Sequence, residues 1–473
     1  MSTLAWRVEY VSSLPSPTML IEPSHSTRLH ATLFAVAALG LVAFAARPGD
    51  RLTLRAMLRP GPTVGTARSA PIVAAAFAPA VETLLPPLWV PLLRGAVSEV
   101  AHLDNPTLQG ADGRALDAFA RRLAGLASAT APLRVLHFGD SIIADDRITG
   151  RLRRRLQREF GDGGLGLVFL RPTARSYHPA GVRFDARGWY PGSVVGPRWE
   201  DGCYGVGGTG FEAPGEGPTA TLTFDRGRTF ELRYLRDPLG GAVSLRLDDE
   251  PARTARVDGV IPALIAANDG PHRVTVRAAG GKVRLYGVVA TRMGPGVTVD
   301  NLGTVSNSAR ALLHLDAAHW SAGLAAEDPA LVIISLGTNE ASHGAMSSVD
   351  REALYRDAGE LYRRIRRALP QASCLVVGPP DAALVLSDGT IGARPALAGI
   401  VDVEARAARS EGCAFFDAMA WMGGRGAIQR WQRQGLADSD LTHLTDAGGA
   451  RIGDAIADAL LGARDEAFAR GVR

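Results

Sequence analysis

Arg134-Val-Leu-His-Phe-Gly-Asp-Ser141 is the stretch that decides the fold, because an apolar strand ends there in a glycine turn that carries a serine. Helical periodicity then resumes over 142–160. The apolar run 330–335 ends in a similar way at Gly337-Thr-Asn339-Glu340, and a helix is expected to follow over about 348–369. The alternation continues with strands at 374–378 and 413–416 and helices near 400–410 and 446–461. Strands and helices that alternate in this way predict a parallel sheet covered by helices on both faces.

One region departs from this rhythm. Between about 219 and 292 the apolar residues alternate with period two, and turns such as Asp225-Arg-Gly and Gly280-Gly separate the runs. Short strands at this spacing predict an inserted all-β sandwich. The run Val297-Thr-Val-Asp300 is interpreted as the return to the parallel sheet. The predicted units are a leader (1–46), a Pro/Ala-rich linker or arm (47–110), a discontinuous α/β domain (111–172 and 293–465) and an inserted loop with a β-sandwich (173–292).

The longest apolar run lies near the N-terminus, over 29–46, between two arginines. It is short for a membrane-spanning helix, whereas Ala43-Phe-Ala45 fits the small-residue pattern of a signal-peptidase site. A translation start at Met19 would give this leader an ordinary length. We therefore expect an exported protein, periplasmic or extracellular, with an uncleaved N-terminal membrane anchor over 29–46 as the alternative.

The charge pattern gives no reason to expect a nucleic-acid partner. The formal net charge is only +4, and Lys282 is the single lysine among 52 basic residues. The arginine-rich segment 151–155 lies at helical spacing beside leucines, so it is interpreted as a solvated helix face rather than as a nucleic-acid surface.

Three cysteines are too few for a disulfide scaffold. Cys374 and Cys413 each open an apolar run, and they form a disulfide if the two strands are neighbours in an oxidising compartment. Two buried core thiols are an equally good interpretation, and Cys203 has no obvious partner. No spacing of cysteine and histidine suggests a structural zinc site, so neither a metal nor another cofactor is expected.

The polar residues beyond the predicted strands indicate nucleophilic catalysis. In an open α/β sheet the active site lies beyond the carboxyl ends of the strands, where Ser141, Gly303 and Asn339 all fall. Asp440-Leu-Thr-His443 precedes the last helix and reaches the same edge. A serine nucleophile needs a base, and the base needs a group that orients it. We predict Ser141, His443 and Asp440 as these three groups.

The oxyanion that forms during acyl transfer needs hydrogen-bond donors fixed in place. The candidates are the backbone N–H groups of Ser141 and Gly303 and the side-chain amide of Asn339.

Three short motifs, in the same order, resemble the first, third and fifth blocks of SGNH (GDSL-type) hydrolases: Gly139-Asp-Ser141, Gly337-Thr-Asn339 and Asp440-Leu-Thr-His443. The resemblance spans about 101–463 apart from the β insert. It implies a flavodoxin-like, three-layer α/β domain, here interrupted by a jelly-roll-like sandwich. The second block of the family has the pattern Asn-x-Gly-x-x-Gly, whereas this chain has Asn301-Leu-Gly303-Thr-Val-Ser306. Whether Gly303 or Ser306 supplies the donor of that block is left open.

Several conspicuous residues have simpler structural interpretations. His137 is expected to be a hydrogen-bonded core histidine, Asp140 to hold the turn and Glu340 to stabilise its loop, while Asp145 and Asp146 are interpreted as a solvated helix face. His343 is a weak candidate for a substrate contact. Aromatic residues ahead of the sandwich can stack on sugar rings, although packing of a long loop is the favoured interpretation: Tyr177, Trp189, Tyr190, Trp199 and Tyr204.

The leading hypothesis is an exported serine esterase that removes short acyl groups, acetyl above all, from a carbohydrate. The architecture resembles bacterial carbohydrate esterases and peptidoglycan O-acetyl esterases. An envelope O-acyltransferase that uses the same triad is one alternative. A catalytically inactive glycan-binding protein is the other.

Overall fold

The computed structural model describes residues 108–109, 113–343 and 348–473, which belong to one compact unit. The predicted leader, its Met19 start and almost all of the predicted linker lie outside these residues. Among the helices that the structure does describe, none has the length and apolar character needed to cross a membrane.

A six-stranded sheet forms the centre of the α/β part. Its strand order is β1-β19-β16-β15-β2-β14, and every neighbouring pair is parallel except β1 with β19. Numbered along the chain, the five parallel strands lie in the order 2-1-3-4-5, which is the flavodoxin-like order. The predicted return to the sheet at Val297 is confirmed. The strands are β1 (Leu108–Gln109), β2 (Leu133–Gly139), β14 (Val297–Gly303), β15 (Leu331–Ser335), β16 (Ser373–Val377) and β19 (Ala414–Phe416).

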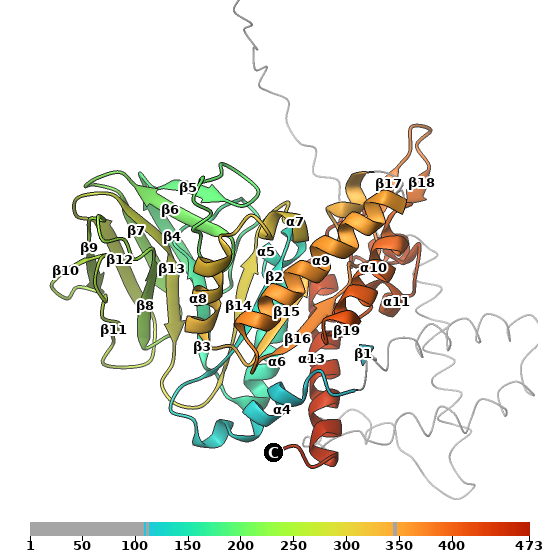
Figure 1. Cartoon of the computed structure of the whole chain (residues 1–473), viewed down its shortest axis with the longest axis horizontal. Helices are drawn as coiled ribbons and strands as arrows, with labels where there is room; N and C mark the ends of the chain where they lie inside the picture. Colours follow the sequence, from blue (N-terminus) through green and yellow to red (C-terminus); the bar gives the residue numbers. More distant parts are fainter. Residues whose placement is uncertain (1–107, 110–112, 344–347) are drawn as a thin grey trace, which may run out of the picture. The chain divides into compact units, whose positions relative to one another are not determined.

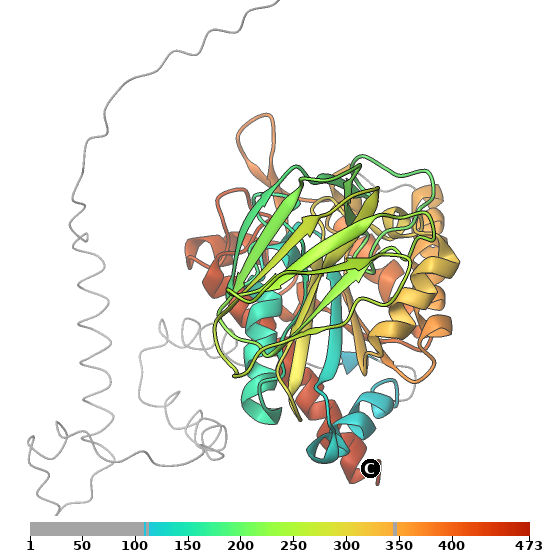
Figure 2. The same ribbon diagram turned by 90° about the vertical axis from the view of Figure 1, so that its left-hand side faces the viewer.

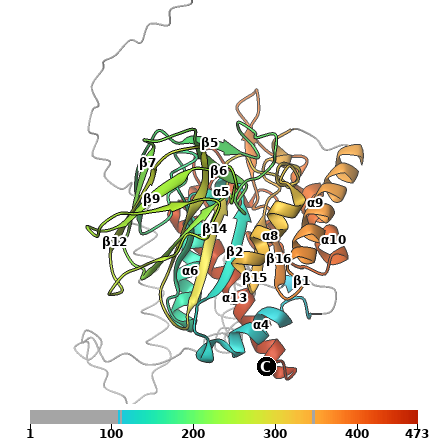
Figure 3. The ribbon, with the colours of Figure 1, turned by 60° about the vertical axis from the view of Figure 1, so that its left-hand side comes forward.

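Helices cover both faces of this sheet, as predicted (Figures 1 and 3). Alternate strand residues contribute to two separate apolar cores. The first face carries α4 (Asp117–Ala124), α6 (Arg147–Phe160), α11 (Ala418–Trp421), α12 (Ala427–Arg433) and α13 (Asp446–Ala469). The second face carries α8 (Ala317–Glu327), α9 (Ser348–Ala368) and α10 (Leu397–Ser410). Shorter helical segments are η2 (Leu126–Ser128), α5 (Ser141–Ala144), α7 (Ala309–Leu312) and η3 (Glu340–His343).

The two cysteines of neighbouring strands form a disulfide. Cys374 lies in β16 and Cys413 immediately precedes β19, and their sulfur atoms are bonded. Of the two interpretations left open by the sequence, the disulfide is therefore confirmed. Cys203 is a free, half-buried thiol.

The period-two region forms two antiparallel sheets, seen face-on in Figure 2. The strand β3 (Gly164–Phe169) pairs with β13 (Val283–Thr291), although β3 lies before the predicted boundary at 173. Antiparallel pairing therefore begins earlier in the chain than the sequence indicates. One sheet contains β10 (Arg253–Arg256), β9 (Ala242–Leu247), β12 (His272–Ala278), β7 (Thr219–Phe224) and β4 (Val182–Arg187). The other contains β11 (Leu264–Ile265), β8 (Thr229–Tyr234), β13 (Val283–Thr291), β6 (Thr209–Ala213) and β5 (Tyr190–Ser193), with β3 (Gly164–Phe169) beside β13.

A buried ion-pair network joins the parallel sheet to the antiparallel strands. Arg134 of β2 pairs with Asp300 of β14 and with Glu327 at the end of α8. The same Glu327 carboxylate accepts hydrogen bonds from Arg233 of β8 at 2.8 and 3.0 Å. Burial acts to raise the pKa of Glu327, but the two guanidinium groups outweigh it and lower the pKa. The junction therefore contains an ionised carboxylate shared by two arginines.

Replacing Glu327 by glutamine is expected to destabilise the protein by about 3–5 kcal/mol, because it removes the buried carboxylate that Arg134 and Arg233 share. Glu231→Gln is the control, since Glu231 also pairs with Arg233 but its side chain is 44% exposed. The control should cost less than about 1 kcal/mol. Urea unfolding measures both, and equal losses in the two variants would contradict this role of Glu327.

Candidate active site

Ser141, His443 and Asp440 meet at the carboxyl edge of the parallel sheet. Ser141 opens α5 directly after β2, and the other two residues lie in the loop between α12 and α13. Ser141 Oγ lies 3.0 Å from His443 Nε2, and His443 Nδ1 lies 2.5 Å from Asp440 Oδ2. An ionised carboxylate only accepts hydrogen bonds, so His443 Nδ1–H donates to Asp440 and Nε2 accepts from the Ser141 hydroxyl. The structure thus brings the three predicted residues together.

The loop that carries Asp440 and His443 fixes its own carboxylate. Asp440 Oδ1 accepts the backbone N–H groups of Thr442 at 3.0 Å and of His443 at 2.9 Å. Burial acts to raise the pKa of Asp440, but the hydrogen bonds from His443 and Thr442 outweigh it, so the pKa lies below its ordinary value. The His443 and Asp440 side chains are 37% and 50% exposed, which leaves the site open to an incoming substrate.

The loop that carries the second motif, Asn301 to Ser306, is called the second-block loop. It shows that one of the predicted oxyanion donors is unsuitable. The Gly303 N–H donates to Asn301 Oδ1 at 3.0 Å, so this group is already used within the protein. A Cβ on Gly303 would lie 2.3 Å from the backbone nitrogen of Ala144. Gly303 is therefore required for close packing of β14 against α5, and its prediction as an oxyanion donor is wrong.

Ser306 occupies the position at which the family pattern has its second glycine. Its φ of 64° lies in the left-handed region, where glycine is favoured. Within the part of the chain that the structure describes, the backbone N–H of Ser306 makes no hydrogen bond. The backbone N–H of Ser141, at the start of α5, makes none within the same residues either.

Asn339 and Asn307 tie the loops of the site together. Asn339 Nδ2 donates to the Asn307 carbonyl at 2.8 Å, and Asn307 Nδ2 donates to the Gly139 carbonyl at 3.2 Å. The Thr304 N–H donates to the same Gly139 carbonyl at 3.0 Å. The residue before Asp140 and Ser141 is thus linked to the second-block loop, and that loop is linked to Asn339.

Behind the nucleophile lies a buried cluster that sequence analysis missed. Asn301 Nδ2 donates to the Ile143 carbonyl at 2.9 Å and to Asp146 Oδ1 at 3.0 Å. Arg153 donates to both carboxylate oxygens of Asp146 at 3.0 and 3.1 Å. Asp146 is 5% and Arg153 is 3% exposed, so neither belongs to a solvated helix face, contrary to the prediction. The seven-residue spacing of these opposite charges, two helical turns, was the signal that could have paired them.

The simpler interpretations of His137 and Asp140 are confirmed. His137 is fully buried, and its ring nitrogens lie 2.9 Å from the hydroxyls of Ser335 and Thr149. Burial lowers the pKa of His137 to about 3, so it stays neutral. Asp140 caps α5 by accepting the Ile142 N–H at 2.9 Å.

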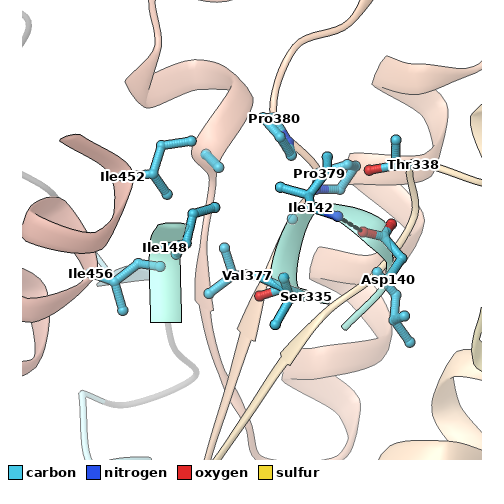
Figure 4. A pocket seen from close by; sticks show the side chains of 14 residues that line it. Asp140, Ile142, Ile148, Ser335, Thr338, Val377, Pro379, Pro380, Ile452 and Ile456 are labelled. Atoms are coloured by element: carbon cyan, nitrogen blue, oxygen red, sulfur yellow. Dashed lines mark hydrogen bonds between the residues drawn. The ribbon is translucent and has the colours of Figure 1, made fainter. Parts of the chain in front are cut away.

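A small cavity lies beneath α5, and its lining is shown in Figure 4. Its volume is about 20 Å³, and isoleucines, prolines and Asp140 line it. Neither Ser141 nor His443 is among the lining residues. The cavity is therefore a packing void next to the turn that carries Ser141, and it is too small to hold a substrate.

Most of the aromatic residues ahead of the sandwich pack internally. Tyr177, Trp189 and Tyr204 are buried. Trp199 is sandwiched between Tyr204, at a centroid distance of 4.8 Å, and the Arg284 guanidinium, at 4.0 Å. Only Tyr190 among these five is widely exposed, at 65%. The packing interpretation is confirmed for the other four. The side chain of His343 lies outside the described residues.

A flavodoxin-like sheet with serine, histidine and aspartate at its carboxyl edge is an arrangement that serine hydrolases use. Residues 250–451 match the model of the GDSL-like lipase/acylhydrolase family. This segment includes Asn339, Asp440 and His443 but begins after Ser141, which only the fold brings to the others. The chain therefore carries a domain of the GDSL-like lipase/acylhydrolase family and is a GDSL-type ester hydrolase.

The solved structures that resemble this chain include one described as a peptidoglycan O-acetylesterase. It is 25% identical, with a TM-score of 0.63, and the match covers 74% of this chain and 96% of that one. A family two carbohydrate esterase from Cellvibrio japonicus is 11% identical over 60% and 98% of the two chains, with a TM-score of 0.25. A lipase/acylhydrolase from Enterococcus faecalis is 16% identical over 35% and 77%, with a TM-score of 0.27. TM-scores this low support no conclusion from the last two. No curated protein matches the chain.

Asp140 makes the stability of the folded protein depend on pH. Burial raises the pKa of Asp140 from 3.8 to about 7, although the Ile142 N–H opposes the shift. The folded state therefore holds a proton that the unfolded state loses, and this contribution to stability disappears as the pH rises from about 4 to about 7. Asp140→Asn keeps the capping oxygen and should flatten this part of the pH profile of unfolding free energy. A variant profile parallel to that of the wild type would contradict the assignment.

Proposed function

We propose that the protein is a serine esterase that hydrolyses short acyl esters, acetyl above all, on a carbohydrate. The observation that carries the proposal is the continuous hydrogen-bond chain from Ser141 Oγ through His443 to Asp440. This arrangement is what a serine needs to become a nucleophile near neutral pH.

In the proposed reaction, the Ser141 hydroxyl oxygen attacks the acyl carbon while its proton passes to His443 Nε2. The tetrahedral intermediate then collapses, the bond from the acyl carbon to the sugar oxygen breaks, and His443 protonates that oxygen. Water next attacks the acyl-enzyme and gives a proton to His443. Release of the carboxylic acid returns the proton to Ser141. Asp440 orients the ring throughout and stabilises its cationic form.

The oxyanion is proposed to bind the backbone N–H groups of Ser141 and Ser306 together with the side-chain amide of Asn339. Ser306 replaces Gly303 in this role because the Gly303 N–H already donates to Asn301. The loop of Ser306 is fixed by Asn307 and Asn339, so its N–H needs no rearrangement during the reaction.

The proposed substrate is an O-acetylated glycan of the cell envelope or another carbohydrate. Support comes from the similarity to the peptidoglycan O-acetylesterase structure, which extends over most of both chains. We also infer export to the periplasm or beyond, from the apolar run 29–46 and the disulfide, which favours an oxidising compartment. We further propose that the antiparallel strands form an inserted sandwich module, whose first strand is β3 and which therefore begins before the predicted boundary at 173.

Ser141→Ala is expected to abolish ester hydrolysis, with a fall in kcat on the order of 10⁶. Asp440→Asn should lower kcat by about 10⁴ because it favours the wrong histidine tautomer. Release of acid from p-nitrophenyl esters, O-acetylated peptidoglycan and acetylated xylan measures the effect and identifies the preferred acyl group. Ser141-independent turnover would contradict the proposal, and transfer of acetyl to added glycan faster than hydrolysis would favour the acyltransferase.

The proposed donors are tested by two substitutions with opposite expectations. Asn339→Ala should lower kcat by about 10²–10³ with little change in KM, because the oxyanion loses a donor. Ser306→Gly keeps the backbone N–H and suits the left-handed φ of 64°, so it should retain activity. A wild-type kcat in Asn339→Ala would exclude Asn339 from the oxyanion site.

A further inference from the structure

The hairpin β17–β18 (Ala383–Val385 and Ile391–Ala393) stands beside the site and has no role in the proposed chemistry. Its strands pair only with each other among the described strands. In Figure 1 it rises at the upper right, beyond the carboxyl end of the parallel sheet. An isolated two-stranded hairpin is marginally stable in water, so this one depends on whatever holds its base.

The base is held by the loop that carries Asp440 and His443. The Ala383 N–H donates to the Leu441 carbonyl at 2.9 Å, and Arg394 Nη2 donates to Thr442 Oγ1 at 2.7 Å. Leu441 has a φ of 54°, a left-handed conformation that is unfavourable for leucine and needs support from its surroundings. The hairpin and the histidine loop are therefore one connected unit.

The hairpin also exposes aliphatic side chains. Val385 and Ile391 lie opposite each other across the two strands, and they are 64% and 45% exposed. Leu386 follows at 43%. Three large apolar side chains close together in water have a free-energy cost that burial against a ligand removes. The cluster indicates a surface that something covers.

The position and polarity of the hairpin select the occupant. The base of the hairpin is hydrogen-bonded to the two residues between Asp440 and His443, so the hairpin is a neighbour of the site on its histidine side. The extreme tip is Ser387-Asp-Gly-Thr390, where the exposed Asp388 carboxylate accepts hydrogen bonds from Thr390. A charged tip disfavours insertion into lipid, whereas aliphatic flanks suit the C–H faces and methyl groups of a substituted polymer.

We propose that the hairpin β17–β18 is a docking arm for the polymeric substrate: Val385 and Ile391 bind the acylated glycan chain beyond the sugar that carries the ester. This inference rests on the proposed function. The inference extends the proposed function by adding a second region that contacts the substrate, and this region favours long substrates over small esters.

The test uses Val385→Ser/Ile391→Ser, whose changes lie on exposed side chains, and Leu239→Ser as the matched control. Leu239 is 93% exposed and lies between β8 and β9 of the antiparallel sheets. The ratio of kcat/KM for O-acetylated peptidoglycan to that for p-nitrophenyl acetate should fall about tenfold in the double variant and stay at the wild-type value in the control. An unchanged ratio in the double variant would overturn the proposal.

Binding separates this proposal from the esterase itself. In the Ser141→Ala background, the hairpin substitutions should weaken co-sedimentation with O-acetylated peptidoglycan about tenfold, whether or not the parent enzyme turns over any ester. Undiminished binding overturns the docking arm. If the hairpin substitutions instead leave glycan binding intact and abolish another interaction, the proposal is also overturned. Loss of self-association would identify a second copy as the occupant, and loss of binding to anionic lipid vesicles would identify a membrane.

Discussion

The side chain of Asn301 is the constraint on which the rest of the site depends. Its amide nitrogen donates to the Ile143 carbonyl of α5 and to the Asp146 carboxylate, while its amide oxygen accepts the N–H of Gly303. One buried residue therefore fixes α5 against the second-block loop. The same side chain occupies the N–H of Gly303, which is why the proposed oxyanion site uses the N–H of Ser306 instead.

Charge is distributed in two ways around this centre. Two sets of buried charges are paired: Asp146 with Arg153, and Glu327 with Arg134 and Arg233. The histidine and aspartate of the site are instead half-exposed and held by their own loop. The Asp146–Arg153 pair thus lies buried behind Ser141, whereas the His443 and Asp440 side chains face solvent.

The sequence was sufficient to predict the parallel sheet, its helices and the meeting of Ser141, His443 and Asp440, because apolar periodicity and the carboxyl ends of strands determine these features. It could not show that β3 joins the antiparallel strands, since a short apolar run has the same pattern in either sheet. Gly303 and Asp146 were misassigned for a related reason. A close backbone approach and a buried ion pair arise from tertiary packing, which local patterns do not record.

Active-site labelling tests the central claim, that Ser141 is the nucleophile, most directly. The protein would be treated with a fluorophosphonate, digested and mapped by mass spectrometry, with His443→Ala as the comparison. The account predicts modification of Ser141 alone, lost or strongly slowed in His443→Ala because the base is gone. A label on another residue, or none on a folded wild type, would contradict it.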